Sequence, residues 1–323
     1  MARGNVCAVA DERERAGLLS RRLVLCAGAL PLGVAACASR PAPAPVAPVK
    51  AAPAGVSVSN STAKLARLER AIGGRLGVAV LDTATGQRLE YRGAERFAMC
   101  STFKLVLVGA VLARVDAGAE QLERRVAYDE SALLEYAPVS SAHVAEGALS
   151  VLALCEAAVT VSDNTAANLL LATLGGPAGL TRYFRTLGDT VSRLDRTEPL
   201  LNSALPGDDR DTTTPQAMLG CAAQLLLGEA LSAASRARLI AWLSAAQTGL
   251  TRLRAGLPPS FRAGDKTGTG EHGATSDIAI AWPPGTAPLL ITAYAMGSGA
   301  PTEQLVAALA EVARITVAEL GLS

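Results

Sequence analysis

The sequence predicts an α/β (α+β) fold, in which an antiparallel sheet flanked by terminal helices lies beside an all-helical domain. Strand-like runs occur near both ends of the folded part, at 76–91 and 276–295, and helical patterns fill the region between them. We therefore expect residues 58–98 and 248–323 to form one α/β domain and residues 99–247 a separate helical domain. A cleft between two domains is a usual place for a functional site.

The first predicted elements are a helix and a hairpin. Ser61 is in position to cap a helix that ends at Gly73-Gly74. The apolar residues of this helix recur at helical spacing: Leu65, Leu68 and Ile72. Two strands follow at 76–82 and 87–91, and the turn between them, Thr-Ala-Thr-Gly, indicates a β-hairpin.

The remaining elements follow from periodicity and turn residues. Helical patterns begin near Ser101 and then cover 149–174, 218–227 and 232–246. Two apolar strands at 276–282 and 289–295 are separated by a Pro-Pro-Gly turn. An amphipathic helix over 302–320 is the last predicted element.

Residues 1–37 have the character of an export signal. Arg21-Arg22 precedes an apolar run of 14 residues at 23–36, which is too short to span a bilayer. The paired arginines resemble a twin-arginine signal. Val34-Ala35-Ala36-Cys37 resembles a bacterial lipobox, which would make Cys37 a lipid anchor; ordinary cleavage after a small residue is the alternative. We expect an exported protein, either periplasmic or anchored to the cell envelope.

Residues 38–57 form a linker rich in proline and alanine. Its five prolines are Pro41, Pro43, Pro45, Pro48 and Pro53. Such a segment cannot build a core and behaves as a semi-rigid spacer. A spacer directly after a lipid anchor would hold the folded part away from the membrane.

Composition excludes some classes of function. The 323 residues include 30 Lys+Arg and 29 Asp+Glu, a net charge of +1, so no basic excess is present to neutralise a nucleic acid. The two histidines, His143 and His272, are far apart and lack the spacing of zinc ligands. We expect no metal and no cofactor, and we expect a monomer.

Ser101-Thr102-Phe103-Lys104 combines a serine and a lysine one helical turn apart. Side chains at positions i and i+3 share one helix face, and the apolar run 105–108 that follows indicates burial. Because burial disfavours the charged form of a lysine, Lys104 could take the proton of the Ser101 hydroxyl. The pattern suggests a nucleophile, although S-x-x-K alone is a weak signal.

Ser162-Asp163-Asn164 lies in a polar break after an apolar helical stretch. The Ser162 hydroxyl could pass a proton to a leaving group, and the Asn164 amide could hold a substrate carbonyl. Serine, aspartate and asparagine are more often helix caps, so this motif alone favours a cap.

Lys266-Thr267-Gly268-Thr269-Gly270 lies on a predicted strand edge. Its lysine and hydroxyls offer partners for a substrate carboxylate, and its glycines allow a backbone N–H to approach a carbonyl closely. A hairpin turn with a solvated lysine is the alternative.

The segment 196–211 has no clear period and the size of an Ω-loop. Arg196 and Asp211 stand at its two ends, where they could close the loop as a bidentate pair. Glu198 and Asn202 lie inside it and could hold a water molecule between them. An ordinary charged surface loop is the alternative.

Together and in this order, S-x-x-K, S-D-N and K-T-G resemble the signature of the class A β-lactamases and penicillin-binding proteins. The resemblance to class A β-lactamases extends from about Ser61 to the C-terminus. It includes the runs 162–170 (Ser-Asp-Asn-Thr-Ala-Ala-Asn-Leu-Leu) and 210–215 (Arg-Asp-Thr-Thr-Thr-Pro). It implies a β-lactamase/transpeptidase-like fold and hydrolysis of β-lactam antibiotics.

The resemblance also implies roles for individual residues. The catalytic residues would be Ser101 as the acylated nucleophile, Lys104 as its activator, Ser162 as proton donor to the β-lactam nitrogen, and Glu198 as activator of the deacylating water. Asn202 would orient that water. The substrate would be bound by Tyr136, Asn164, Lys266, Thr267, Gly268 and Thr269, and the N–H groups of Ser101 and Thr269 would form the oxyanion hole. Whether Lys104 or Glu198 is the acylation base stays open.

Two departures from the family pattern concern an arginine and the cysteines. Many members carry an arginine where this chain has Thr275, and Arg252 lies where some relatives supply that guanidinium instead. A surface charge is the alternative for Arg252. Cys155 and Cys100 match single halves of disulfides known in some members, but their partner positions are not cysteines, so neither bridge is expected.

Two other functions compete with this interpretation. A D-alanyl-D-alanine carboxypeptidase or another penicillin-binding protein would share the serine, the lysine and K-T-G. Such enzymes lack a positioned base for deacylation, so Glu198 with Asn202 favours the lactamase. A non-enzymatic, envelope-anchored cell-wall binding protein would fit the lipobox and linker, but it predicts loss of at least one catalytic residue.

Overall fold

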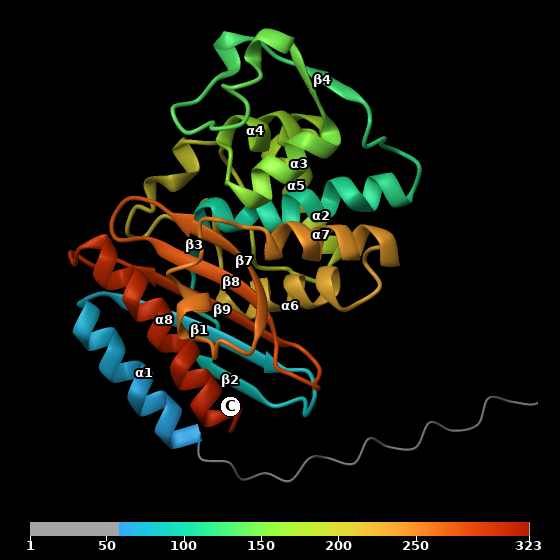
Figure 1. Ribbon diagram of the computed structural model, residues 1–323. Helices are drawn as coiled ribbons and strands as arrows, with labels where there is room; N and C mark the ends of the chain where they lie inside the picture. The colour runs from blue at the N-terminus through green and yellow to red at the C-terminus, as the bar shows by residue number, and fades with distance from the viewer. Residues whose placement is uncertain (1–57, 323) are drawn as a thin grey trace, which may run out of the picture. The chain divides into compact units, whose positions relative to one another are not determined.

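The computed structural model describes residues 58–322. A five-stranded antiparallel sheet forms the centre of its α/β part (Figure 1). The strand order is β2-β1-β9-β8-β7. The strands are β1 (Arg75–Asp82), β2 (Arg88–Tyr91), β7 (Arg262–Thr269), β8 (Thr275–Trp282) and β9 (Leu289–Met296). The N-terminal hairpin therefore joins the C-terminal strands through β1 and β9, which pair from Arg75 opposite Met296 to Asp82 opposite Leu289. The expected antiparallel sheet is confirmed.

The two terminal helices cover one face of this sheet. Helix α1 (Val58–Ile72) and helix α8 (Thr302–Glu319) contact each other along that face (Figure 1). Because side chains alternate along a strand, Leu76, Val78 and Val80 of β1 join the core beneath these helices. Ala79, between them, belongs instead to the larger core on the opposite face.

Six helices build the part of the chain around that larger core. They are α2 (Phe103–Asp116), α3 (Val151–Thr160), α4 (Asn164–Thr173), α5 (Gly176–Thr186), α6 (Pro215–Leu226) and α7 (Ala233–Ser244). Helix α2 contacts each of the other five and is buried from Phe103 to Leu112, as the apolar run after Lys104 predicts. Helix α6 reaches the sheet and contacts β1 and β9. The proposed domain boundaries at 98 and 247 stay a prediction.

Short elements complete the fold. Two small antiparallel pairs join β3 (Phe97–Ala98) to β6 (Thr212–Thr213) and β4 (Arg125–Ala127) to β5 (Ala148–Ser150). Five 3₁₀ turns lie at Cys100–Thr102, Glu130–Ala132, Val144–Glu146, Leu200–Ser203 and Leu253–Gly256. The first of these turns leads directly into α2 and carries Ser101.

The structure corrects two sequence expectations. Ser61 is not a helix cap, because the backbone is already helical from Val58 and Ser61 lies inside α1. The predicted end of that helix holds: α1 stops at Ile72, and Gly73 follows with φ 66°. Helix α5 has no predicted counterpart, since its Gly- and Pro-rich start hides the helical period.

The expected export signal (1–37), with its lipobox, and the linker (38–57) lie outside the described residues. Within 58–322, no helix is both long and apolar enough to cross a membrane.

Candidate active site

Ser101 lies in the 3₁₀ turn before α2, and Lys104 lies in the first turn of that helix. Cys100, just before the serine, has φ 43°, so the chain bends sharply here. The Lys104 Nζ atom donates to the Ser101 Oγ at 2.9 Å. The one-turn spacing therefore brings the amine and the hydroxyl into hydrogen-bonding distance.

Lys104 is completely buried among oxygen acceptors. Its ammonium group donates to the Ser162 carbonyl at 2.8 Å and to the Asn164 Oδ1 at 2.6 Å, and Nζ lies 3.0 Å from the Glu198 Oε1. Burial lowers the pKa of Lys104, while the negative charge of Glu198 opposes that shift. A lysine with a lowered pKa gives up its proton more readily than an exposed one, so its neutral amine is more available as a base.

Ser162 lies between two buried lysines at the junction of α3 and α4. It has φ 61°, and its Oγ accepts from Lys266 Nζ at 3.0 Å and from Lys104 Nζ at 3.3 Å. Burial, together with the positive charge of Lys104, lowers the pKa of Lys266 to about 7. The hydroxyl is thus placed to pass a proton between these amines and a bound molecule.

Asp163 caps a helix, as the commoner interpretation of the S-D-N motif predicts. Its side chain accepts from the Ala166 N–H at the start of α4. The same carboxylate also accepts from the N–H and the hydroxyl of Ser140, so it ties a neighbouring loop to α4. The S-D-N motif therefore serves both as a helix cap and as part of the site. The cap residue Asp163 fixes its two neighbours, Ser162 and Asn164, at the start of α4.

The segment 196–211 is closed at its base by Arg196 and Asp211, but not as a bidentate pair. The Arg196 Nε donates to the Asp211 Oδ2 at 2.5 Å, and its Nη1 turns to the Ser203 Oγ at 3.0 Å. The other oxygen of Asp211 accepts the backbone N–H groups of Asp195 and Arg196. The expected two-bond fork is wrong because those backbone donors occupy the second carboxylate oxygen.

Inside this loop, Glu198 faces Ser101. The Ser101 hydroxyl donates to the Glu198 Oε1 at 3.0 Å, and the Asn202 amide donates to its Oε2 at 2.5 Å. The Asn168 side chain on α4 holds the Glu198 backbone with two hydrogen bonds, one to the carbonyl at 2.9 Å and one from the N–H at 3.0 Å. The carboxylate is therefore fixed from both sides.

The strand β7 supplies the opposite wall. Arg252 is buried beside it, and its Nη1 donates to the carbonyls of Gly268 and Ser276, both at 2.7 Å. Its Nη2 donates to the Thr269 Oγ1 at 2.6 Å. Burial lowers the pKa of Arg252, against the charges of nearby aspartates. The alternative of an ordinary surface charge is wrong, because this guanidinium lies inside the site.

A pocket of about 340 Å³ brings these residues together. Its lining comprises Ser101, Tyr136, Ser162, Asn164, Asn202, Thr248, Arg252, Thr267, Gly268 and Thr269. Lys104, Glu198 and Lys266 are buried and bonded to the residues that line it. Tyr136 is half exposed, and its carbonyl accepts from the Asn164 N–H at 3.0 Å.

Sequence reasoning missed two residues of this site. Thr248 lines the pocket and shares a 2.7 Å hydrogen bond with Thr267, but a lone threonine gives no sequence signal. Asn168 fixes the backbone of Glu198. It lies in the run 162–170 that carries the family resemblance, so the sequence did indicate this residue. Among residues 58–322, no group of three or more His, Cys, Asp and Glu side chains is arranged to hold a metal ion. Cys100, Cys155 and Cys221 are buried free thiols.

This arrangement is that of a serine enzyme for acyl transfer. The Ser101 hydroxyl is hydrogen-bonded to both an amine and a carboxylate, and the Ser162 hydroxyl contacts both buried lysines, as such chemistry requires. The wall formed by Arg252, Thr267 and Thr269 offers a cation and hydroxyls to an anionic substrate group.

Comparison with known proteins gives the family. The model of the β-lactamase enzyme family matches residues 60–320. The chain is 47% identical to β-lactamase CTX-M-8 of Citrobacter amalonaticus over 75% of this chain and 83% of that one. It is 44% identical to β-lactamase AST-1 of Nocardia asteroides over 95% and 96% of the two chains. The structure of the ancestral (GNCA) class A β-lactamase superimposes with a TM-score of 0.79 at 58% identity, covering 80% of this chain and 99% of that one. The chain belongs to the class A β-lactamases.

Proposed function

We propose that this protein hydrolyses β-lactam antibiotics through an acyl-enzyme on Ser101 and thereby confers resistance to them. One observation carries the proposal. Glu198 is within hydrogen-bonding distance of the Ser101 hydroxyl and is held by Asn202 and Asn168, so a base for deacylation stands beside the nucleophile.

In acylation, the Ser101 Oγ attacks the β-lactam carbonyl carbon and the C–N bond of the ring breaks. The Ser101 proton passes to Lys104 or to Glu198, both of which contact this hydroxyl. Ser162 delivers a proton to the departing nitrogen and is resupplied by the lysines that it contacts. The N–H groups of Ser101 and Thr269 stabilise the oxyanion that forms on the carbonyl.

In deacylation, a water molecule bound by Glu198 and Asn202 attacks the ester carbonyl. Glu198 takes one proton of this water, the ester C–O bond breaks, and Ser101 recovers its proton. The short contact from Asn202 to Glu198 supports this step, since it fixes the carboxylate that must orient the water.

The substrate is bound by residues on two opposite walls of the pocket. Asn164 holds the acylamide side chain of the substrate, and Tyr136 forms a half-exposed wall at the mouth. On β7 and beside it, the substrate carboxylate is bound by Lys266, Thr267, Thr269 and Arg252, with Gly268 allowing close approach. No cofactor, metal or nucleic acid takes part in this mechanism.

The second candidate is a D-alanyl-D-alanine carboxypeptidase. It shares the nucleophile and the lysine, but such enzymes deacylate β-lactams slowly because they lack a positioned general base. A non-enzymatic cell-wall binding protein would not retain a serine, a lysine and a glutamate in mutual contact. The geometry therefore favours hydrolysis of β-lactams.

The purified protein should be assayed with a penicillin, a cephalosporin, a carbapenem and a D-alanyl-D-alanine peptide. Rapid and complete hydrolysis of at least one β-lactam, with no release of D-alanine, supports the proposal. Stoichiometric acylation without turnover, together with release of D-alanine, would instead identify the carboxypeptidase.

We also propose that the protein acts as a monomer outside the cytoplasm, in the periplasm or anchored to the envelope through Cys37. The basic and apolar pattern of residues 1–37 supports export, and the lipobox pattern supports the anchor. Mass spectrometry of the mature N-terminus distinguishes a diacylated Cys37 from an unmodified cleavage product.

A further inference from the structure

A second hollow, of about 480 Å³, is lined mainly by α5 and by the segment 190–195 that follows it. Its lining shares no residue with the active-site pocket. Four arginines contribute to it: Arg96, Arg182, Arg185 and Arg193. We call this hollow the arginine groove. The chain as a whole is almost balanced in charge, with 30 basic and 29 acidic residues.

Part of this positive charge is not neutralised locally. Arg193 is paired with Asp195 through two hydrogen bonds of 2.8 and 2.6 Å. Arg96 donates to neutral oxygens, the Thr212 hydroxyl at 2.9 Å and the Val191 carbonyl at 3.2 Å. Its nearest carboxylate belongs to Asp209, which lies 3.8 Å away and is 68% exposed, so this ion pair is weak.

The other two arginines add charge without a carboxylate partner. Arg185 donates to the Asp189 backbone carbonyl at 2.5 Å. Within the described residues, Arg182 has neither a hydrogen bond nor an ion pair. Three carboxylates lie near these four guanidinium groups: Asp195, Asp209 and the buried Asp189 beneath the turn. The groove therefore keeps an excess of about one positive charge.

The charges farther along the Ω-loop do not remove this excess, because they neutralise one another. Arg196 is paired with Asp211, and Arg210 is paired with Asp208. Two arginines and two aspartates therefore cancel next to the groove.

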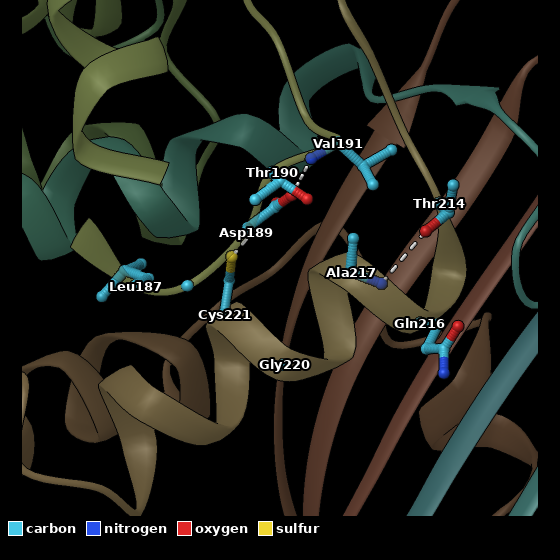
Figure 2. A pocket seen from close by; sticks show the side chains of 10 residues that line it. Leu187, Asp189, Thr190, Val191, Thr214, Gln216, Ala217, Gly220 and Cys221 are labelled. Atoms are coloured by element: carbon cyan, nitrogen blue, oxygen red, sulfur yellow. Dashed lines mark hydrogen bonds between the residues drawn. The ribbon is translucent and has the colours of Figure 1, made fainter. Parts of the chain in front are cut away.

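The backbone of residues 190–192, which borders the groove, is held by hydrogen bonds to Asp189. Figure 2 shows Asp189 between Val191 and Cys221 of α6. The Asp189 Oδ1 accepts from the N–H groups of Val191 and Ser192 at 2.7 and 2.9 Å. The Cys221 thiol on α6 donates to the other oxygen of Asp189 at 3.4 Å. The carbonyls of Val191 and Asp189, which accept from Arg96 and Arg185, therefore belong to a fixed turn. Because these two arginines are already oriented, ligand binding should cost little conformational entropy.

We propose that the arginine groove binds a phosphate-bearing anion, such as a diphosphate or the phosphate of a lipid headgroup. The planar fork of a guanidinium matches two oxygens of a phosphate. A phosphate group also presents several anionic oxygens at once, so it can bond to more than one of these guanidinium groups, whereas a carboxylate presents two. The volume suits a small ligand of this kind.

The test is a calorimetric titration of the full chain with inorganic pyrophosphate at low ionic strength. The variant Arg182→Ala/Arg193→Ala removes two groove charges, and the control Arg70→Ala/Arg88→Ala removes two exposed arginines elsewhere. We expect saturable binding by the wild type and the control, and binding weaker by about tenfold or more in the groove variant. Equal binding by the two double variants, or no binding by the wild type, would overturn the proposal.

Two further controls locate the bound anion. The active site also contains cations, so the Arg252→Ala variant is titrated as well, and it should bind pyrophosphate like the wild type. Loss of binding in that variant would assign the anion to the active site and refute the groove. The groove variant should retain hydrolysis of β-lactams, which shows that it is folded.

A sedimentation assay distinguishes the two sources of phosphate. Vesicles of phosphatidylglycerol are compared with vesicles of phosphatidylcholine at the same ionic strength. Sedimentation with the anionic vesicles alone, lost in the groove variant, identifies a lipid headgroup as the ligand. Binding of pyrophosphate without binding to vesicles identifies a soluble phosphate compound.

Discussion

Replacing Asn168 by alanine removes the two hydrogen bonds that fix the backbone of Glu198. These bonds measure 2.9 and 3.0 Å and join α4 to the Ω-loop. Each contributes about 1 kcal/mol net, so the free energy of unfolding should fall by about 2 kcal/mol. For a folded region of this size, that loss lowers the melting temperature by roughly 4–8 °C.

The catalytic effect of Asn168→Ala should be larger than its effect on substrate binding. The loop would no longer hold Glu198 in one position relative to the Ser101 Oγ, so the deacylation rate should fall by about tenfold or more. Stopped-flow kinetics with a penicillin should show a burst followed by a slow steady state. Thr173→Ala is the matched control, since its hydroxyl bonds only to the Leu170 carbonyl in the same helix.

The result that would refute this reasoning is specific. If Asn168→Ala melts at the wild-type temperature and deacylates at the wild-type rate, the side chain of Asn168 does not position Glu198. Equal effects of Asn168→Ala and Thr173→Ala would lead to the same conclusion, because only one of these residues contacts the loop.

Three further predictions follow from other contacts. Thr214 caps α6 by accepting from the Ala217 N–H, so Thr214→Ala should lower stability by about 1 kcal/mol in urea unfolding and leave hydrolysis unchanged; an unaltered midpoint would contradict the cap. Arg252→Ala should raise the KM for penicillins by about tenfold with a smaller change in kcat, and an unchanged KM would exclude contact with the substrate carboxylate. Burial lowers the pKa of Lys266 from 10.5 to about 7, so above pH 7 the unfolded chain binds more protons and stability should rise with pH. Thermal melts between pH 7 and about 8.5, below the titration of ordinary thiols, should show this rise, and Lys266→Met should flatten it; an equal slope in both proteins would contradict the assignment.

Much of the fold follows from local sequence patterns. The strands around residues 76–91 and 276–295 and the long helices are visible because alternation and helical periodicity reflect burial directly. Ser61 was misplaced because a serine near a helix start resembles a cap even when the preceding residues are already helical. Helix α5 was not predicted, because its Gly-Gly-Pro start resembles a turn. Contacts with the rest of the fold override that local preference.

The parts of the site that lie in contiguous motifs could be predicted from the sequence. Contacts between residues far apart in the chain could not, because they depend on the tertiary structure. Ser101 and Lys104 meet because helical geometry alone requires it. The sequence does not reveal that Lys104 also contacts Glu198, 94 positions later, or that Thr248 joins the pocket. Arg196 likewise had an evident partner in Asp211, but the competing backbone donors that prevent a bidentate pair appear only in three dimensions.

The central claim is that Glu198 drives deacylation of an ester formed on Ser101. The most direct test is intact-protein mass spectrometry of Glu198→Ala after brief exposure to a penicillin, with the wild type as control. The account predicts a persistent adduct of the mass of the intact penicillin on the variant and only unmodified mass for the wild type at the same time. Rapid return of the variant to its unmodified mass would contradict the account.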